Sequence, residues 1–402
     1  MNIFDDMLPI ILNSRYLRER VAKPKSREFA SVILPQLDDY DFKEEYRLLP
    51  SSFSAILDRI QDHPVFHTSD ATGRPQEDPH YQFQVALKRF GTEASSASGL
   101  SQISKHFGLG KGTVLLYTER VSIALMSLWK DVVSWKTTSE KREMKQRIIN
   151  KGFEASLPSA IKSDRKVFSR CVGMVDGTLI VLKEKPALGK LDSMSYFNYR
   201  KQKYGFQATV ICDDECRILK FNTNFPGAVH DSRAWRKLGV YQRPRDYLQG
   251  GEFLLADSAY PLTEYTIVPF KRSAKPGVKA RLSPEKKLFN RTLSGLRVSV
   301  EHCIGRLKAR FPSLRNLPHR IRSKDDVGVC LRWIGSCVIL HNLLIDLDDE
   351  MDARWTKPED IEEDEEDEDE DGDTHRTRRE RVTGKKKRNA LMLAILEECN
   401  SN

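Results

Sequence analysis

The sequence lacks the features that mark secreted and membrane proteins. Acidic residues, Asp5 and Asp6, stand near the start of the chain, where a secretory signal needs a basic region. No stretch approaches the roughly 18 consecutive apolar residues of a membrane span. The seven cysteines are an odd number and are scattered along the chain, which is typical of a reducing compartment. We therefore expect neither secretion, nor membrane insertion, nor a structural disulfide.

A zinc-binding pattern is also missing. Cys212 and Cys216 frame the acidic run Asp-Asp-Glu, but no second Cys or His pair follows at ligand spacing. We interpret this segment as a turn between two strands.

The charge is unevenly distributed. The 402-residue chain has a net charge of +9, yet residues 359–373 contain 13 acids and no base. The rest of the chain is therefore strongly basic, at about +22, which indicates a polyanionic partner. The acidic run cannot bury enough apolar surface to fold. It could pair with the basic segment after it, bind a basic partner or limit non-specific DNA contact.

Three acidic residues occupy comparable places in the central part of the sequence. Asp176 and Asp257 each follow a short apolar run, which predicts a buried strand that breaks into a turn at its carboxylate. Glu301 lies on the polar stripe of a predicted helix whose apolar stripe includes Val300 and Ile304. If the fold brings these acids together, their oxygens can hold a hard divalent cation, Mg²⁺ or Mn²⁺.

The order of the predicted elements indicates the fold class. Strands ending near Asp176, Cys212 and Asn224 are followed by a helix, a fourth strand before Asp257, and a later helix with Glu301. This is the chain order of an α/β, ribonuclease-H-like mixed sheet with flanking helices. We assign residues 161–348 to this ribonuclease-H-like domain, 1–40 to an N-terminal extension and 349–402 to a disordered tail, first acidic and then basic.

Residues 41–160 predict an all-α domain. Apolar residues from 100 to 114 are spaced as the core of a helix-turn-helix, with Thr113 as the N-cap of its second helix. In a DNA-binding version, four side chains would meet phosphates and base edges: Lys105, Lys111, Tyr117 and Arg120. A plain helical hairpin is equally consistent with the pattern.

Further basic segments fit a protein that acts on DNA. The loop 271–281 is basic and rich in turn residues, which suits contact with a phosphate backbone. The residues between 376 and 388 form two basic clusters of the kind found in nuclear import signals, so we expect the nucleus. A short amphipathic helix is predicted for residues 390–396, and a largely apolar helix for 327–345.

Five motifs in this order resemble the Harbinger-type DDE transposases and the nucleases derived from them. The motifs are Val-Asp176-Gly-Thr, Pro-Gly-Ala-Val-His-Asp231-Ser-Arg, Leu-Leu-Ala-Asp257-Ser-Ala-Tyr-Pro, Val-Glu301-His-Cys-Ile-Gly-Arg-Leu-Lys and Leu-His-Asn342. The resemblance implies that Asp176, Asp257 and Glu301 are catalytic metal ligands and that Asp231 is often a fourth. An Asp before a helix is also a common N-cap, so both roles stay open for Asp231.

The resemblance also implies an activity and partners. We expect a metal-dependent endonuclease that cuts double-stranded DNA with two ions, with strand transfer as a further step in a full transposase. Lys308 and Arg297, on the Glu301 face, could touch a phosphate, or Arg297 could pair with Glu301. A Myb-like DNA-binding protein and a homo-oligomer are possible partners. The alternatives are a non-catalytic nuclear DNA-binding or scaffold protein derived from a transposase, and a nuclease acting on RNA or branched DNA.

Overall fold

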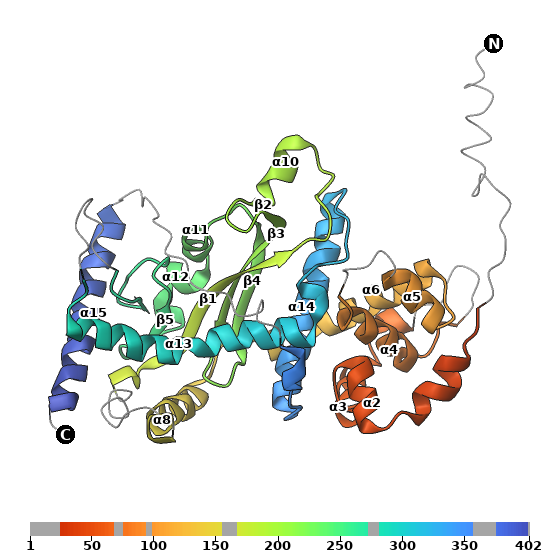
Figure 1. Ribbon diagram of the computed structural model, residues 1–402, viewed down its shortest axis with the longest axis horizontal. Coiled ribbons are helices and arrows are strands. Elements are labelled where there is room, and N and C mark those ends of the chain that lie inside the picture. Colours follow the sequence, from red (N-terminus) through yellow and green to blue (C-terminus); the bar gives the residue numbers. More distant parts are fainter. Residues whose placement is uncertain are drawn as a thin grey trace, which may run out of the picture.

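The computed structural model describes residues 25–67, 75–93, 99–154, 167–271, 281–356 and 375–400. A mixed sheet lies in the middle of the molecule, with long helices across it and a cluster of shorter helices at one end (Figure 1). The acidic run 359–373 and most of the basic loop 271–281 lie outside the described residues.

The sheet has the ribonuclease-H-like arrangement. Three antiparallel strands, β1 (Cys171–Val181), β3 (Lys203–Cys212) and β4 (Ile218–Pro226), are followed by β5 (Phe253–Ala256) and β6 (Thr266–Ile267), which run parallel to β1. The order across the sheet is β4-β3-β1-β5-β6, and the short β2 (Phe197–Asn198) pairs with β3 beside β4. The predicted fold class is thereby confirmed.

The prediction that the first strand breaks at Asp176 is wrong. Strand β1 continues to Val181 because β3 pairs with it over the whole stretch from Met174 to Val181. The other neighbour of β1, strand β5, pairs with it only as far as Val175. Asp176 therefore stands where β1 loses one of its two partners.

Both faces of the sheet are covered. One core includes Met174, Leu255 and residues of the long helices α13 (Pro284–Arg310) and α14 (Lys324–Asp346). The second core includes Val175 and Ala256, with helices α11 (Asp231–Arg236) and α12 (Gly239–Gln242) on that side. Neighbouring strand residues belong to different cores because side chains alternate across a pleated strand.

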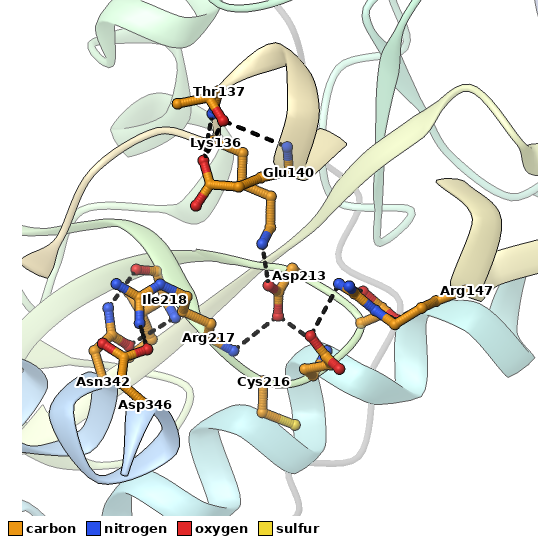
Figure 2. Close-up of polar contacts among 12 residues, drawn as sticks. Lys136, Thr137, Glu140, Arg147, Asp213, Cys216, Arg217, Ile218, Asn342 and Asp346 are labelled. Carbon is orange, nitrogen blue, oxygen red and sulfur yellow. Dashed lines mark hydrogen bonds and ion pairs between the residues drawn. The ribbon is translucent and has the colours of Figure 1, made fainter. Parts of the chain in front are cut away.

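Helix α14 is a core helix of the protein. By length and composition it could cross a membrane, with a mean hydropathy of 1.6, which corrects the expectation that no stretch approaches this limit. However, 72% of its apolar window is buried inside the protein. Asn342 explains part of this placement: its side chain accepts a hydrogen bond from the Ile218 amide (2.9 Å) and donates to the Ile218 and Val132 carbonyls (Figure 2).

The N-terminal helices pack directly on α14. Helix α6 (Lys111–Ser127) contacts α4 (Pro79–Phe90) on one side and α14 on another, and one hydrophobic core runs through all three. Arg332 of α14 also forms an ion pair with Glu119 of α6. The remaining elements here are η1 (Phe29–Ile33), η2 (Leu34–Gln36), α2 (Asp39–Tyr46), α3 (Pro50–Ile60), η3 (Pro64–Phe66), α5 (Gly99–His106), α7 (Trp129–Val132) and α8 (Thr138–Glu154).

Part of the chain predicted as a disordered tail is folded. Helix α15 spans His375–Asn400, and its Ile395 is 1% exposed within the main core. Asp349, at the start of the predicted tail, is buried in an ion pair with Arg310. The sequence pattern suggested only a short helix at 390–396, because the basic residues before it resemble a solvated segment, whereas several of them contact the domain. The remaining short elements are α10 (Lys190–Ser195), η5 (Pro244–Asp246), η6 (Pro312–Leu314) and η7 (Ala353–Trp355).

Candidate active site

Two of the predicted acids follow paired positions of neighbouring strands. Val175 of β1 is in register with Ala256 of the parallel strand β5. Asp176 directly follows Val175 in the chain, and Asp257 directly follows Ala256. Val175 and Ala256 both belong to the core on the α11 side. By the alternation of the strands, the residue after each points to the other face, which α13 covers. The backbone amides of Gly177 and Ala259 donate to Asp176 (2.8 Å) and Asp257 (3.3 Å).

Helix α13 brings the third acid to the same face. Val300, Ile304 and Leu307 are buried against the sheet, as the sequence stripe predicted. Arg297 of this helix donates to Glu301 (2.8 Å), and its other terminal nitrogen lies 3.9 Å from Asp176. Its side chain is only 4% exposed. One buried guanidinium therefore joins Glu301 to Asp176, which places these two acids together and confirms the predicted pair between Arg297 and Glu301.

Asp231 approaches from the other face of the sheet. It is the first residue of α11, and the N-cap is His230, whose ring nitrogen accepts from the Ser232 amide. The Asp231 carboxylate receives a hydrogen bond from Gln207 and lies directly over Gly177. A Cβ at position 177 would stand 1.8 Å from an Asp231 oxygen, so only glycine permits this approach. Capping is therefore not the role of Asp231.

Tyr260 lies near acids that come from separate elements. It is buried, and its hydroxyl has no hydrogen-bond partner among the described residues. Burial raises the pKa of Tyr260 well above its usual value, and the negative charges of Asp231, Asp176 and Asp257 raise it further. Arg297 acts in the opposite direction. The three aspartates are thus close enough to one phenol to act on it electrostatically.

The donor set suits Mg²⁺ or Mn²⁺. It offers carboxylate oxygens from four residues, and hard divalent cations prefer oxygen ligands. Asp176 and Glu301 keep 15% and 17% of their side chains exposed, so they remain accessible from solvent. A buried hydroxyl without a partner, that of Tyr260, lies within the same group.

Among the described residues, the group of acids that has metal-like spacing is a different one, and it has another role. Asp213, Asp214 and Glu215 lie together in the turn between β3 and β4. Lys136 pairs with Asp213 (2.8 Å), and Arg147 pairs with both Asp214 and Glu215 (Figure 2). Asp213 also accepts from the Glu215 and Arg217 amides. Basic side chains and backbone amides therefore already occupy this cluster, which holds the turn against α8.

The predicted DNA-binding residues divide into exposed and buried ones. Lys105 and Lys111 are exposed and Arg120 is half-buried, on the hairpin formed by α5, the turn and α6. Tyr117 is 7% exposed, because its ring belongs to the core between the helices, and Lys308 is 6% exposed within α13. The prediction that these two reach DNA is therefore wrong for the folded chain. Helix α6 begins at Lys111 with Gly110 as its N-cap, not Thr113.

One feature beside the acids was missed from the sequence. A cavity of about 290 Å³ is lined by Gly177, Gln207 and Asp231 and, across from them, by residues 198–201. Tyr199 is 64% exposed there, next to Arg200 and Lys201. An exposed aromatic residue beside two basic residues is a signal for nucleic-acid contact. The Asn-Tyr-Arg-Lys run contains that signal, but its position beside Asp231 comes only from the fold.

Comparisons with known proteins agree with this geometry. Residues 175–342 match the family described as "DDE superfamily endonuclease". "Protein ALP1-like" of Arabidopsis thaliana is 25% identical over 304 residues, which are 70% of this chain and 64% of that protein. "Putative nuclease HARBI1" of Homo sapiens is 23% identical over 187 residues, 46% of this chain and 48% of that protein. The chain thus spans about two thirds or less of these relatives' lengths. No solved structure matches the chain.

The fold, the acids and these matches define a DDE superfamily endonuclease domain. Its first and last matched residues, Val175 and Asn342, enclose all four acids of the site. Within this superfamily, the two relatives support the resemblance to nucleases derived from Harbinger transposases.

Proposed function

We propose that this protein is a metal-dependent DNA endonuclease that hydrolyses phosphodiester bonds with two divalent ions. One observation carries the proposal: Asp176 and Asp257 follow register-paired residues, and Arg297 joins Asp176 to Glu301. These contacts support a site made of carboxylates from two strands and a helix on the face of the sheet that α13 covers.

Asp176, Asp257 and Glu301 would hold the ions, with Asp231 as a fourth ligand. Two such ions, when bound, lower the pKa of a water molecule and stabilise the charge on the departing 3′ oxygen. The protein residues have supporting tasks. Arg297 holds the Glu301 carboxylate towards Asp176, and Gly177 leaves room for Asp231. The backbone amides at residues 177 and 259 fix the two strand acids.

The first test is cleavage of a supercoiled plasmid with Mg²⁺ or Mn²⁺. We expect nicking by the wild type and a loss of more than about 100-fold in Asp176→Asn, Asp257→Asn and Glu301→Gln. Even changes to residues that only orient the ligands of a metal cost about 10-fold to 100-fold. The matched control is Asp246→Asn, which removes an exposed carboxylate outside the site. Binding of Mn²⁺, measured as a rise in melting temperature, should fall in the three variants and not in the control.

The outcomes separate the enzyme from the non-catalytic alternative. A wild type that binds DNA but does not cut it, with variants that bind equally well, would contradict the endonuclease and support a DNA-binding scaffold. The same assay should then be repeated with a Myb-like protein added, since we propose such a partner from the resemblance. Comparing duplex, branched DNA and RNA as substrates tests the remaining alternative.

We also propose that the hairpin of α5 and α6 contacts DNA and that the protein acts in the nucleus. Lys105 and Lys111 are exposed, which supports the first statement. The exposed basic residues of α15 support the second. A Lys105→Gln/Lys111→Gln variant should bind duplex DNA more weakly, and a fluorescent fusion with Lys385→Gln/Lys386→Gln should lose nuclear accumulation. An unchanged affinity or distribution would contradict the respective statement.

A further inference from the structure

Helix α15 lies outside the residues that match the endonuclease family, yet it is docked on this domain. It runs beside the N-terminal part of α13, at the end of the molecule away from α2 to α6 (Figure 1). Lys387 donates to the carbonyls of Gly251 (2.9 Å) and Glu264 (2.7 Å). Arg388 donates to Pro269 (3.1 Å) and stacks over Phe270, 3.9 Å from the ring centre. These contacts fix the helix to the segments around β5 and β6.

Gly384 makes the docking close. A Cβ at this position would lie 2.7 to 2.9 Å from backbone atoms of Thr263. Two side chains of the basic cluster, those of Lys387 and Arg388, thus serve as anchors. Other basic residues of the helix, Arg381 and Lys385, remain exposed.

The docked helix and the Asp257 loop enclose a cavity of about 660 Å³. One part of its wall is the segment 258–263, which begins with the residue after Asp257. Another part is α15, and the N-terminal turn of α13 contributes Lys286. The cavity wall therefore includes the residue next to the candidate ligand Asp257 and extends to α15.

The charge of this cavity is strongly positive. Five basic residues line it and one acid, Glu380, whose carboxylate accepts from the Tyr241 hydroxyl. The basic residues are Lys271, Lys286, Arg381, Lys385 and Arg388. They come from three separate parts of the chain, so no single charged segment explains the concentration. Aromatic and apolar groups, Tyr260, Phe270 and Met392, complete the wall, as in channels that bind nucleic-acid strands.

We propose that α15 and the Asp257 loop form a channel that binds the sugar-phosphate backbone of the DNA strand next to the scissile phosphate. This inference rests on the proposed endonuclease function and adds a binding surface to which α15, outside the matched family region, contributes one wall. The exposed basic side chains of α15 and the Lys286 side chain of α13 contact phosphates from two sides. The channel thus positions a strand whose scissile phosphate lies at the acids.

The test is the salt dependence of DNA binding by the full chain, measured without divalent metal by fluorescence anisotropy. Arg381→Gln/Lys385→Gln should bind more weakly and reduce the slope of log K against log salt by about 2, or about 1 per phosphate contact. The matched control, Arg379→Gln/Lys386→Gln, removes two exposed charges from another side of the same helix and should leave the slope unchanged.

A second pair tests the opposite wall independently of α15. Lys286→Gln should reduce the slope by about 1, whereas Lys287→Gln, its exposed neighbour outside the cavity, should not. Equal slopes for test and control variants, with normal binding by the wild type, would overturn the channel and leave the endonuclease standing. The expected slopes without any metal-dependent cleavage would overturn the endonuclease and keep the channel. A wild type that does not bind DNA would overturn both.

Discussion

Arg297 allows a quantitative test of how the site is assembled. Its buried guanidinium pairs with Glu301 at 2.8 Å and faces Asp176 at 3.9 Å. Replacing it with Gln leaves two carboxylates close together without their shared cation. Removing one partner of a buried pair costs about 3 to 5 kcal/mol. We expect the lower end, about 3 kcal/mol, because Asp176 and Glu301 are still 15% and 17% exposed and remain partly solvated.

The assay is thermal unfolding of Arg297→Gln, Glu301→Gln and the double variant without divalent metal. A loss of about 3 kcal/mol corresponds to a melting temperature lower by about 6 to 12 °C for a domain of this size. The double variant should lose less than the sum of the two single variants, because the second substitution removes one of the carboxylates that the first left unpaired. Added Mn²⁺ should restore part of the Arg297→Gln loss, since cations then offset the same charges.

Two results would refute this reasoning. A melting temperature of Arg297→Gln within about 1 °C of the wild type would show that the ion pair does not stabilise the site. Strict additivity of Arg297→Gln and Glu301→Gln would show that the two side chains do not interact. Arg291→Gln, an exposed arginine earlier on α13, is the matched control and should change stability by less than about 0.5 kcal/mol.

Two further predictions concern the elements around the site. Burial acts to raise the pKa of Glu252, but its bonds to Lys141 and Lys145 outweigh burial and lower that pKa below 4.5. The carboxylate of Glu252 therefore stabilises the fold fully above pH 4.5. This stabilisation is lost as the pH falls through the lowered pKa. The stability difference between the wild type and Glu252→Gln in denaturant titrations should shrink on acidification, and a constant difference would contradict this. Gly384→Val should loosen α15 at a cost of about 1 to 3 kcal/mol, which is measured as faster proteolysis in the basic segment. Ala390→Val, on the exposed side of the same helix, should not change the rate of proteolysis. Equal proteolysis rates for the two variants would contradict the close docking.

The sequence alone predicted the elements whose signals are local. Apolar runs before Asp176 and Asp257 and the stripe containing Val300 and Ile304 indicated two buried strands and a helix, and all three are present. Their order was sufficient for the fold class, because it matches few known arrangements. The apolar helix at 327–345 was also correct, since its burial on several sides appears directly in its composition.

Tertiary contacts decided the rest. Strand β1 continues beyond Asp176 because β3 supplies hydrogen bonds from a segment about 30 residues away. Tyr117 and Lys308 seemed available to DNA because each lies on a partly polar helix, but both are buried in the folded chain. Whether Asp231 caps a helix was decided by the fold, in which His230 is the N-cap of α11 and Asp231 lies against Gly177. The sequence suggested that the basic segment of α15 is a solvated tail. Local composition does not show that Lys387 and Arg388 donate hydrogen bonds to backbone carbonyls, or that Arg388 stacks on the ring of Phe270. Local pattern thus fixes which groups the chain carries, and long-range packing decides which of them meet.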